Sequence, residues 1–539
     1  MTDAVPNQTS TLSEFLPKIV TVWREGYHLG DLRADAIAGL TVAIVALPLS
    51  IAIAIASGVG PAAGLFTTII GGFLVSLLGG SRYQIGGPAG AFIVLIAACE
   101  TAIGPQGLIL ATILSGLFLT AAGLMRLGSY VRYIPYPVTL GFTAGIAVII
   151  FASQIKDLIG LQLPGAEPAG IIPKVQALWA ARGTLSAPAV WVSLVTILVI
   201  VGVKHLAPKW PSLLIAITLG GLAVYLCTLP VATIHDRFGD LPRIPPAPAL
   251  PAITLSSVAA ALPWAASFTL LGAIESLLSA VVADGMSGAR HRSNAELVAQ
   301  GLANVGSALF GGFCTTGTIA RTATNVRAGS RGPVSGMLHS VFVLLFLVVA
   351  APLAGHIPLA SLAGVLAVVS WTMVEKAEIR DLAHYSKADA LVIAVTFLLV
   401  VFRDLTEGIV AGFALGGIVF IQRMSETASI TCTTGDDQAE PGRVTVRLSG
   451  PFFFGAAAQL DASLDQIADH PRQFILDLRD LTYLDSSGAR SLELLARKYN
   501  RNGGQIEFQG VRPGQRRMLE QSGLIAPLVL YQQDRPATN

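Results

Sequence analysis

Two ionisable residues lie inside apolar stretches of the chain, where an uncompensated charge is costly. Arg321 lies in Thr318-Ile-Ala-Arg-Thr, and Glu275 lies within the apolar run from Phe268 to Val282. Ionisable residues at membrane depth generally mark ligand sites or ion paths. Arg321 therefore predicts an anion site; the alternative is a structural cation that reaches the membrane surface.

Glu275 must be protonated or paired with a cation at this depth. Ser279 follows four residues later, on the same face of a helix, and offers a further oxygen. The pair predicts either a sodium site or an acid that carries a proton. The alternative is a hydrogen bond that joins two helices.

Two apolar segments, 88–103 and 317–329, are too short to cross a membrane, and each follows a glycine-rich extended piece. Where a broken span resumes as a helix, its first N–H groups are unpaired and attract anions. Pro88 suits a first helical turn, and the small residues Ala89, Gly90 and Ala91 leave the amides open. One such segment in each half predicts a transporter binding site; the alternative is two structural re-entrant loops.

The elements that must position these residues are membrane-spanning helices. Charged residues make up 13% of the chain, against about 25% in soluble proteins, and 53% of the residues are hydrophobic. With the two short segments, twelve longer apolar runs predict fourteen spans: 35–57, 60–79, 107–127, 135–155, 187–205, 211–228, 258–283, 294–310, 332–353, 357–374, 386–402 and 406–422.

Basic residues in the short loops predict the orientation. With the N-terminus inside, the inner loops hold thirteen basic residues and the outer loops six. This predicts a multi-pass plasma (inner) membrane protein with a cytoplasmic segment 1–34 and a transmembrane domain 35–425. An even number of spans places the C-terminal part in the cytoplasm as well.

The composition changes after Met424. We expect a polar linker at 426–442 and a small α/β domain at 443–539. Alternating or apolar runs predict strands near 444–448, 474–478 and 505–508, and helices are expected at 455–469, 486–501 and 513–522.

Several motifs together resemble the sulfate permease (SulP) family of anion transporters with a C-terminal STAS domain. They are Ala38-Gly-Leu-Thr-Val-Ala-Ile-Val-Ala-Leu-Pro-Leu, Gly86-Gly-Pro-Ala, Gly317-Thr-Ile-Ala-Arg-Thr-Ala-Thr-Asn-Val-Arg-Ala-Gly and, in the tail, Leu484-Asp-Ser-Ser-Gly. Gly272-Ala-Ile-Glu-Ser-Leu-Leu and Val282-Ala-Asp-Gly-Met read like bacterial members that carry C4-dicarboxylates. Bicarbonate carriers of the family are nearly as similar.

The resemblance implies two inverted seven-span repeats, arranged as a core and a gate domain that move as an elevator, usually within a homodimer. The implied substrate site is lined by Leu49, Ile53, Ala89, Gly90, Ala91, Ile319, Ala320 and Arg321. Many relatives have glutamine at the position of Leu49, and some have an aromatic residue at that of Ile53. The pocket of this chain is thus expected to be less polar.

The ion-coupling positions implied by the resemblance are Glu275, Ser279 and Gly317. The sodium-coupled bicarbonate carriers have aspartate and threonine at the first two positions, and a threonine where this chain has Ile319. Loss of that side-chain oxygen favours proton over sodium coupling, and a sodium ion at Glu275 remains the alternative. No other cofactor is expected.

Ser487 aligns with the phosphoacceptor of the anti-sigma antagonists, where the loop precedes a helix; the alternative is a purely structural cap. A regulatory protein could bind this domain. The sequence has no nucleotide loop, metal motif or catalytic triad and no long basic run, so we expect neither an enzyme nor a nucleic-acid partner. Secondary active transport of C4-dicarboxylates with protons is the leading hypothesis. The alternatives are sodium-coupled bicarbonate transport, proton-coupled sulfate transport, a channel-like relative and a membrane-bound sensor that signals through the STAS domain.

Overall fold

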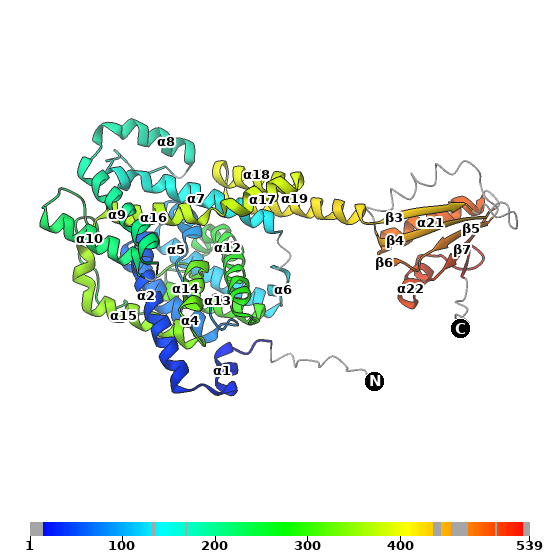
Figure 1. The fold of residues 1–539 in the computed structure, drawn as a ribbon, viewed down its shortest axis with the longest axis horizontal. Helices are drawn as coiled ribbons and strands as arrows, with labels where there is room; N and C mark the ends of the chain where they lie inside the picture. Colours follow the sequence, from blue (N-terminus) through cyan, green and yellow to red (C-terminus); the bar gives the residue numbers. More distant parts are fainter. Residues whose placement is uncertain are drawn as a thin grey trace. The chain divides into compact units, whose positions relative to one another are not determined.

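The computed structural model describes residues 14–131, 135–165, 167–168, 170–208, 210–434, 443–453, 473–501 and 504–531. The chain divides into two compact units, Met1–Phe413 and Ala414–Asn539. The described residues of the first unit form helices (Figure 1) and one short two-stranded ribbon.

The described residues include nine helical segments long and apolar enough to cross a membrane. They contain α2 (Leu29–Ala56), α3–η1–α4 (Pro61–Leu78), η2–α5 (Gly90–Leu124), α7 (Tyr136–Ile159), α9 (Ala187–Leu206), α12 (Leu255–Ser287), α15 (Val334–Gly355), α16–α17 (Leu359–Tyr385) and α19 (Leu405–Glu426). Four shorter helices also coincide with predicted spans: α10 (Ser212–Leu226), α13 (Ser293–Leu309), α14 (Ile319–Arg327) and α18 (Lys387–Phe402). The remaining predicted span is the second half of α5, so the predicted polytopic helical fold is confirmed.

The helix α5 (Ile93–Leu124) is interrupted in its middle. Gly104 has a φ of 71°, which glycine adopts without steric cost, and Pro105 follows it. The break lies between the predicted segments 88–103 and 107–127. It leaves a short first half whose N-terminus lies within the protein rather than at a membrane surface.

Contacts divide the spans into two groups. In the first, called the core, α5 packs against α12 and α13, and α2 packs against α14 and α15. In the second, called the gate, α7 packs against α16 and α18, and α9 against α10 and α16. The core helices approach closely: a methyl group on Gly301 of α13 would lie 2.4 Å from the carbonyl oxygen of Gly116 in α5.

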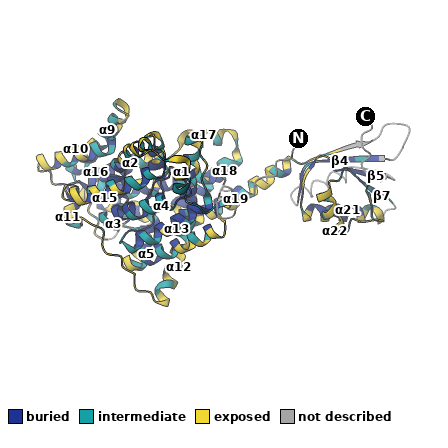
Figure 2. Ribbon diagram, turned by 90° about the horizontal axis from the view of Figure 1, so that it is seen from below, coloured by how far each residue is buried: buried dark blue, intermediate teal, exposed yellow. Residues whose placement is uncertain are grey.

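Large apolar side chains on the gate helix α9 face outward. Exposed residues follow one another along α9 in Figure 2. Trp191 and Leu198 are 65% and 60% exposed, whereas Thr196 is fully buried. Because these outward side chains belong to a span that is apolar all round, lipid is the solvent that suits them.

The second unit contains a sheet of six described strands. Along the sheet the order is β3 (Ser429–Thr434), β4 (Arg443–Phe452), β5 (Gln473–Asp477), β7 (Gln505–Gln509) and β8 (Val529–Tyr531), with β6 (Leu481–Leu484) paired to β4. Only β3–β4 is antiparallel. Helices α21 (Ser486–Arg501) and α22 (Pro513–Gln521) contribute Leu492 and Leu519 to its core.

The predicted α/β class of this unit is confirmed. The strand β3 lies inside the range predicted as a linker, and the sequence analysis did not predict β6 or β8, which have only four and three residues. The helix predicted at 455–469 lies outside the described residues.

Candidate functional site

Two extended pieces, one from each half of the first unit, pair at the centre of the core. The strand β1 (Gly86–Gly87) runs antiparallel to β2 (Thr316–Gly317), with Gly86 opposite Gly317 and Gly87 opposite Thr316. One strand leads into η2 (Gly90–Phe92) and α5, the other into α14. Since the strands are antiparallel, the two helices leave the ribbon in opposite directions and their N-termini lie on either side of it.

Both helix N-termini lack a capping side chain. The N-cap residues are Ala89 and Thr318, and neither side chain bonds to an N–H of the first turn. The Thr318 hydroxyl instead donates to the carbonyl of Ile85, at 3.2 Å. The first N–H groups of each helix thus remain open to a ligand, which favours an anion.

The predicted lining residues comprise the two helix ends themselves and two residues of α2. Leu49 and Ile53 of α2 are buried, as are Ala89 and Ala91, whereas Gly90 and Ile319 are half-buried and Ala320 is exposed. The side chains that flank the ends are small or apolar, so backbone amides supply the polar contacts available there.

Two gate residues that the sequence analysis missed also reach the first helix end. A methyl group added at Gly90 would lie 3.2 Å from Cδ1 of Ile150 in α7 and 3.8 Å from the sulfur of Met373 in α16. Nothing in an isolated apolar run distinguishes Ile150 from its neighbours. The candidate site therefore lies where core meets gate.

Arg321 lies in the first turn of α14, and its side chain packs against β1 and Pro88. Its side chain is fully buried, and Nη2 donates to Ser50 Oγ at 3.0 Å and to the carbonyl of Pro88 at 3.5 Å. Nε and Nη1 have no hydrogen-bond partner among the described residues. A methyl group on Gly87 would lie 2.3 Å from Nη1, so the guanidinium packs directly against β1. Its charge thus lies beside Pro88, which directly precedes the N-cap residue of the first helix end.

Hydroxyl groups on α12 hold the ribbon and α14 in place. Ser279 donates to Thr322 Oγ1 at 3.0 Å, and Thr322 Oγ1 in turn accepts from the backbone N–H of Ile85 at 3.1 Å. Ser276 Oγ lies 2.7 Å from Thr316 Oγ1. Ser279 thus joins two helices, which the sequence analysis kept as the alternative to an ion ligand. The supporting residues Ser276 and Thr322 were missed because serine and threonine are common in transmembrane helices.

Glu275 lies on α12 one turn before Ser279 and is 8% exposed. No hydrogen bond or ion pair links its carboxylate to another residue in the described part of the chain. Gly317, the third predicted coupling position, pairs with Gly86, and its N–H lies 3.4 Å from Ser276 Oγ. Glu275 is therefore the carboxylate of this helix that remains available for a proton or cation.

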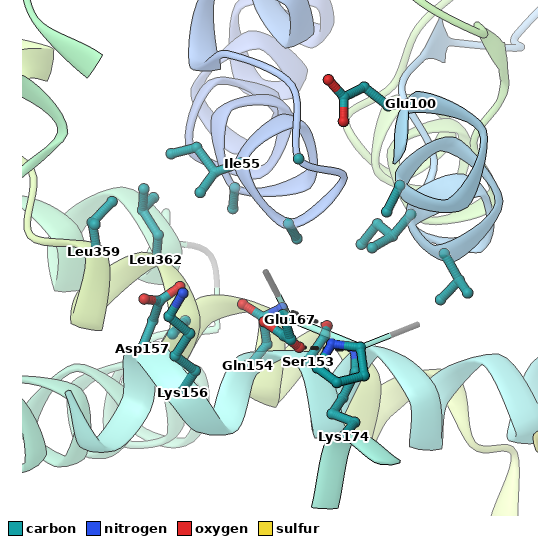
Figure 3. A pocket seen from close by; sticks show the side chains of 18 of the residues that line it. Ile55, Glu100, Ser153, Gln154, Lys156, Asp157, Glu167, Lys174, Leu359 and Leu362 are labelled. Carbon is teal, nitrogen blue, oxygen red and sulfur yellow. Dashed lines mark hydrogen bonds and ion pairs between the residues drawn. The ribbon is translucent and has the colours of Figure 1, made fainter. Parts of the chain in front are cut away.

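A cavity of about 340 Å³ opens between core and gate at the end of the bundle where α7 terminates (Figure 3). On the core side it is lined mainly by small and apolar residues of α2 and α5, among them Ala52, Ile93 and Ala97. The gate side combines apolar residues of α16 with polar residues, among them Gln154 and Lys156 of α7. We call this space the α7 cavity.

In the second unit, Ser487 lies exposed in the first turn of α21, which begins at Ser486. Asp485 precedes the helix, and its Oδ1 accepts from the N–H of Gly488 at 2.6 Å. The aspartate thus caps the helix and leaves the serine hydroxyl free of that role.

The sequence matches known families over most of its length. The sulfate permease family model matches residues 32–396, and the STAS domain model matches residues 436–533. The protein YvdB of Bacillus subtilis is 38% identical over 509 residues, covering 93% of this chain and 95% of YvdB. The bicarbonate transporter BicA of Synechocystis is 31% identical over 521 residues, covering 92% of this chain and 91% of that protein.

Solved structures show the same arrangement. The transmembrane domain of a cyanobacterial bicarbonate transporter BicA is similar at 30% identity with a TM-score of 0.62, over 72% of this chain and 98% of that one. The inward-facing structure of the murine Slc26a9 anion transporter is similar with a TM-score of 0.82, over 97% of this chain and 92% of that one. At 18% identity the second likeness concerns the fold alone.

Proposed function

Because the chain belongs to the sulfate permease family, we propose that it is a secondary active transporter whose small-anion substrate binds between the first turns of α5 and α14. The observation that carries this proposal is the pair of uncapped helix N-termini on either side of the β1–β2 ribbon. Their open amides and dipoles attract a negative group, and Arg321 in the first turn of α14 adds a full charge.

The substrate we propose is a C4-dicarboxylate taken up with protons. The apolar side chains of Leu49 and Ile53 suit the carbon chain of an organic acid better than they suit a hydrated inorganic ion. Glu275, which has no partner among the described residues, would bind the proton. Sodium-coupled bicarbonate transport is the second candidate, favoured by the 31% identity to BicA, and proton-coupled sulfate transport is the third.

Transport would follow an elevator mechanism. The core carries the ribbon and both helix ends, while the gate contributes Ile150 and Met373 to the other side of the site. A movement of the core along this apolar contact would carry the anion from one side of the membrane to the other. We place the protein in the plasma membrane as a homodimer, with the N-terminus and the STAS domain in the cytoplasm and the α7 cavity on the outer side.

Counterflow uptake in proteoliposomes tests this proposal. Vesicles preloaded with succinate, fumarate, bicarbonate or sulfate should be compared for saturable accumulation of the labelled anion. We expect exchange of succinate and fumarate above that of bicarbonate or sulfate. Binding without uptake would indicate a sensor, and flux that does not saturate would indicate a channel.

We propose that the STAS domain regulates transport or assembly and takes no part in substrate binding, because every residue of the candidate site precedes Ser425. A chain truncated after Ser425 should bind succinate with an affinity close to that of the full chain, measured by scintillation proximity or calorimetry. Loss of binding in a truncated protein that remains monodisperse would contradict this assignment.

A further inference from the structure

The α7 cavity reaches the N-terminal end of α5. Ile93, the first residue of α5, lines it, and Gly90 of the preceding turn faces Ile150 of α7. Lys156 lies six residues beyond Ile150 on α7, about 9 Å further along the helix axis at 1.5 Å per residue. Because Ile93 and Lys156 line the same cavity, a molecule held at the start of α5 can extend through this cavity toward Lys156.

The cavity is large enough for such a molecule. Its volume of about 340 Å³ is roughly tenfold the ~30 Å³ that one water occupies in the liquid. A small organic acid and several waters fit into this space together.

Six charged side chains line the α7 cavity, and four of them already form ion pairs. Lys174 Nζ lies 2.8 Å from Glu167 Oε1, and Arg237 Nη1 lies 3.6 Å from Asp157 Oδ1. The other two, Lys156 on the gate side and Glu100 on the core side, have no hydrogen bond or ion pair within the described ranges (Figure 3). The charge of Lys156 acts on the neighbouring Asp157, but among the described residues Lys156 is the cation of this cavity without a hydrogen bond or ion pair, and it can contact a ligand.

Gln154 adds a neutral donor beside this cation. Its side chain is 4% exposed, and Nε2 donates to Ser153 Oγ at 2.9 Å, which uses one of the two amide hydrogens. Because a buried amide N–H needs an acceptor, the second Nε2 hydrogen of Gln154 favours a ligand in the cavity that accepts a hydrogen bond.

We propose that Lys156, assisted by Gln154, binds the distal negative group of a substrate that carries two, while the first negative group lies at the start of α5. This inference rests on the proposed function and assigns its selectivity: Lys156 makes the protein prefer dianionic to monoanionic organic acids. A monoanion whose one negative group is bound at the helix end gains no affinity from Lys156. A dianion gains a charge-assisted contact, about tenfold to a hundredfold in affinity.

The test compares two ligands and four proteins. Succinate and monomethyl succinate share a carbon skeleton, but the ester has one carboxylate fewer. Their affinities should be measured by calorimetry or by competition for uptake in the wild type, Lys156→Met, Glu100→Gln and Lys204→Met. Lys204 is an exposed lysine on α9 outside the cavity and controls for the loss of one surface charge.

We expect Lys156→Met to weaken succinate binding about tenfold to a hundredfold and to leave monomethyl succinate binding within about twofold. Lys204→Met should change neither affinity. Glu100→Gln should leave succinate binding unchanged or strengthen it, because a carboxylate facing the dianion is removed. Monodispersity and thermal unfolding of each variant establish that it is folded.

Equal losses for both ligands in Lys156→Met would overturn the inference. So would a loss of succinate binding in Glu100→Gln that matches the loss in Lys156→Met, because Lys156 would then act through a pairing with Glu100. A folded wild type that moves bicarbonate or sulfate but no succinate would overturn the dianion assignment and leave anion transport standing. A folded wild type that moves none of these anions would refute the proposed function itself.

Discussion

Replacing Arg321 with methionine is the sharpest perturbation of the site. The arginine is among the largest fully buried side chains, so alanine would leave a cavity and confound binding with stability. Methionine is shorter than arginine but leaves a much smaller cavity than alanine does. Ser50, which accepts from Nη2, keeps its contact with Thr68 at 2.7 Å. Because the lost guanidinium has no carboxylate partner among the described residues, we expect little change in unfolding temperature.

The effect on anion binding follows from the distance between the Arg321 guanidinium and the helix end at Gly90. Nη1 packs against Gly87, three residues before Gly90, and three residues span at most about 10 Å. At an effective dielectric constant of about 20, a unit charge at 10 Å contributes about 1.7 kcal/mol. Arg321→Met should therefore weaken anion binding about fifteenfold to twentyfold.

Isothermal titration with succinate in nanodiscs measures this change, and Arg321→Lys is the matched control because it keeps the charge. We expect the lysine variant to bind several-fold more tightly than the methionine variant. An unchanged dissociation constant in folded Arg321→Met, or equal losses in both variants, would show that the charge of Arg321 does not act on the anion.

Three further predictions concern coupling, the ribbon and the STAS domain. Wild-type uptake should rise as external pH falls and should not respond to replacing sodium with potassium. The Glu275→Gln variant should bind the anion but lose pH-driven accumulation in proteoliposomes. Sodium-dependent uptake that is lost in this variant would instead make Glu275 a sodium ligand. Gly317→Ala would place a methyl group 1.8 Å from Gln84 Nε2, so we expect this variant to lose anion binding and to unfold at a lower temperature. Gly183→Ala is the control and should have no effect, because a methyl group there would have no atom within 4 Å. Hydrogen bonds from neighbouring arginines, Arg497 foremost, hold the pKa of Glu493 below its usual value of about 4.3. Its contribution to stability is therefore present above that pH and is lost as pH falls through the depressed pKa. Glu493→Gln should reduce the acid-induced rise in hydrogen exchange of α21, and an unchanged rise would remove Glu493 as a cause.

The helical spans and the broken segments could be predicted from the sequence because their signals are local. Long apolar runs gave the spans, and the glycines around Gly86 and Gly317 marked the extended pieces that the structure pairs as β1 and β2. The break at Gly104 coincides with a gap between two predicted segments. Each of these features depends on residues adjacent in the chain.

The packing of Arg321 against β1 and Ser50 could not be predicted, because it depends on contacts with residues far away in the sequence. Ser50 lies 271 residues from Arg321, and Pro88 lies 233 residues from it. The same holds for Ser279, whose hydroxyl bonds to Thr322 on another helix. Gln154 and Lys156 were missed for a different reason. Polar and charged residues at the end of an apolar run are typical of an ordinary membrane boundary, and these two are linked to a site only by the cavity that both of them line.

The position of the bound anion tests the site most directly. Solid-state NMR can measure distances between ¹³C-carboxylate succinate and ¹⁵N-labelled backbone amides in the full-length protein in lipid. We predict strong dipolar coupling from one carboxylate to the amides of Gly90 and Ala91 and to those of Ile319 and Ala320, abolished by excess unlabelled succinate. Coupling of bound succinate to other amides, with none to these four, would show that the two helix ends do not form the anion site.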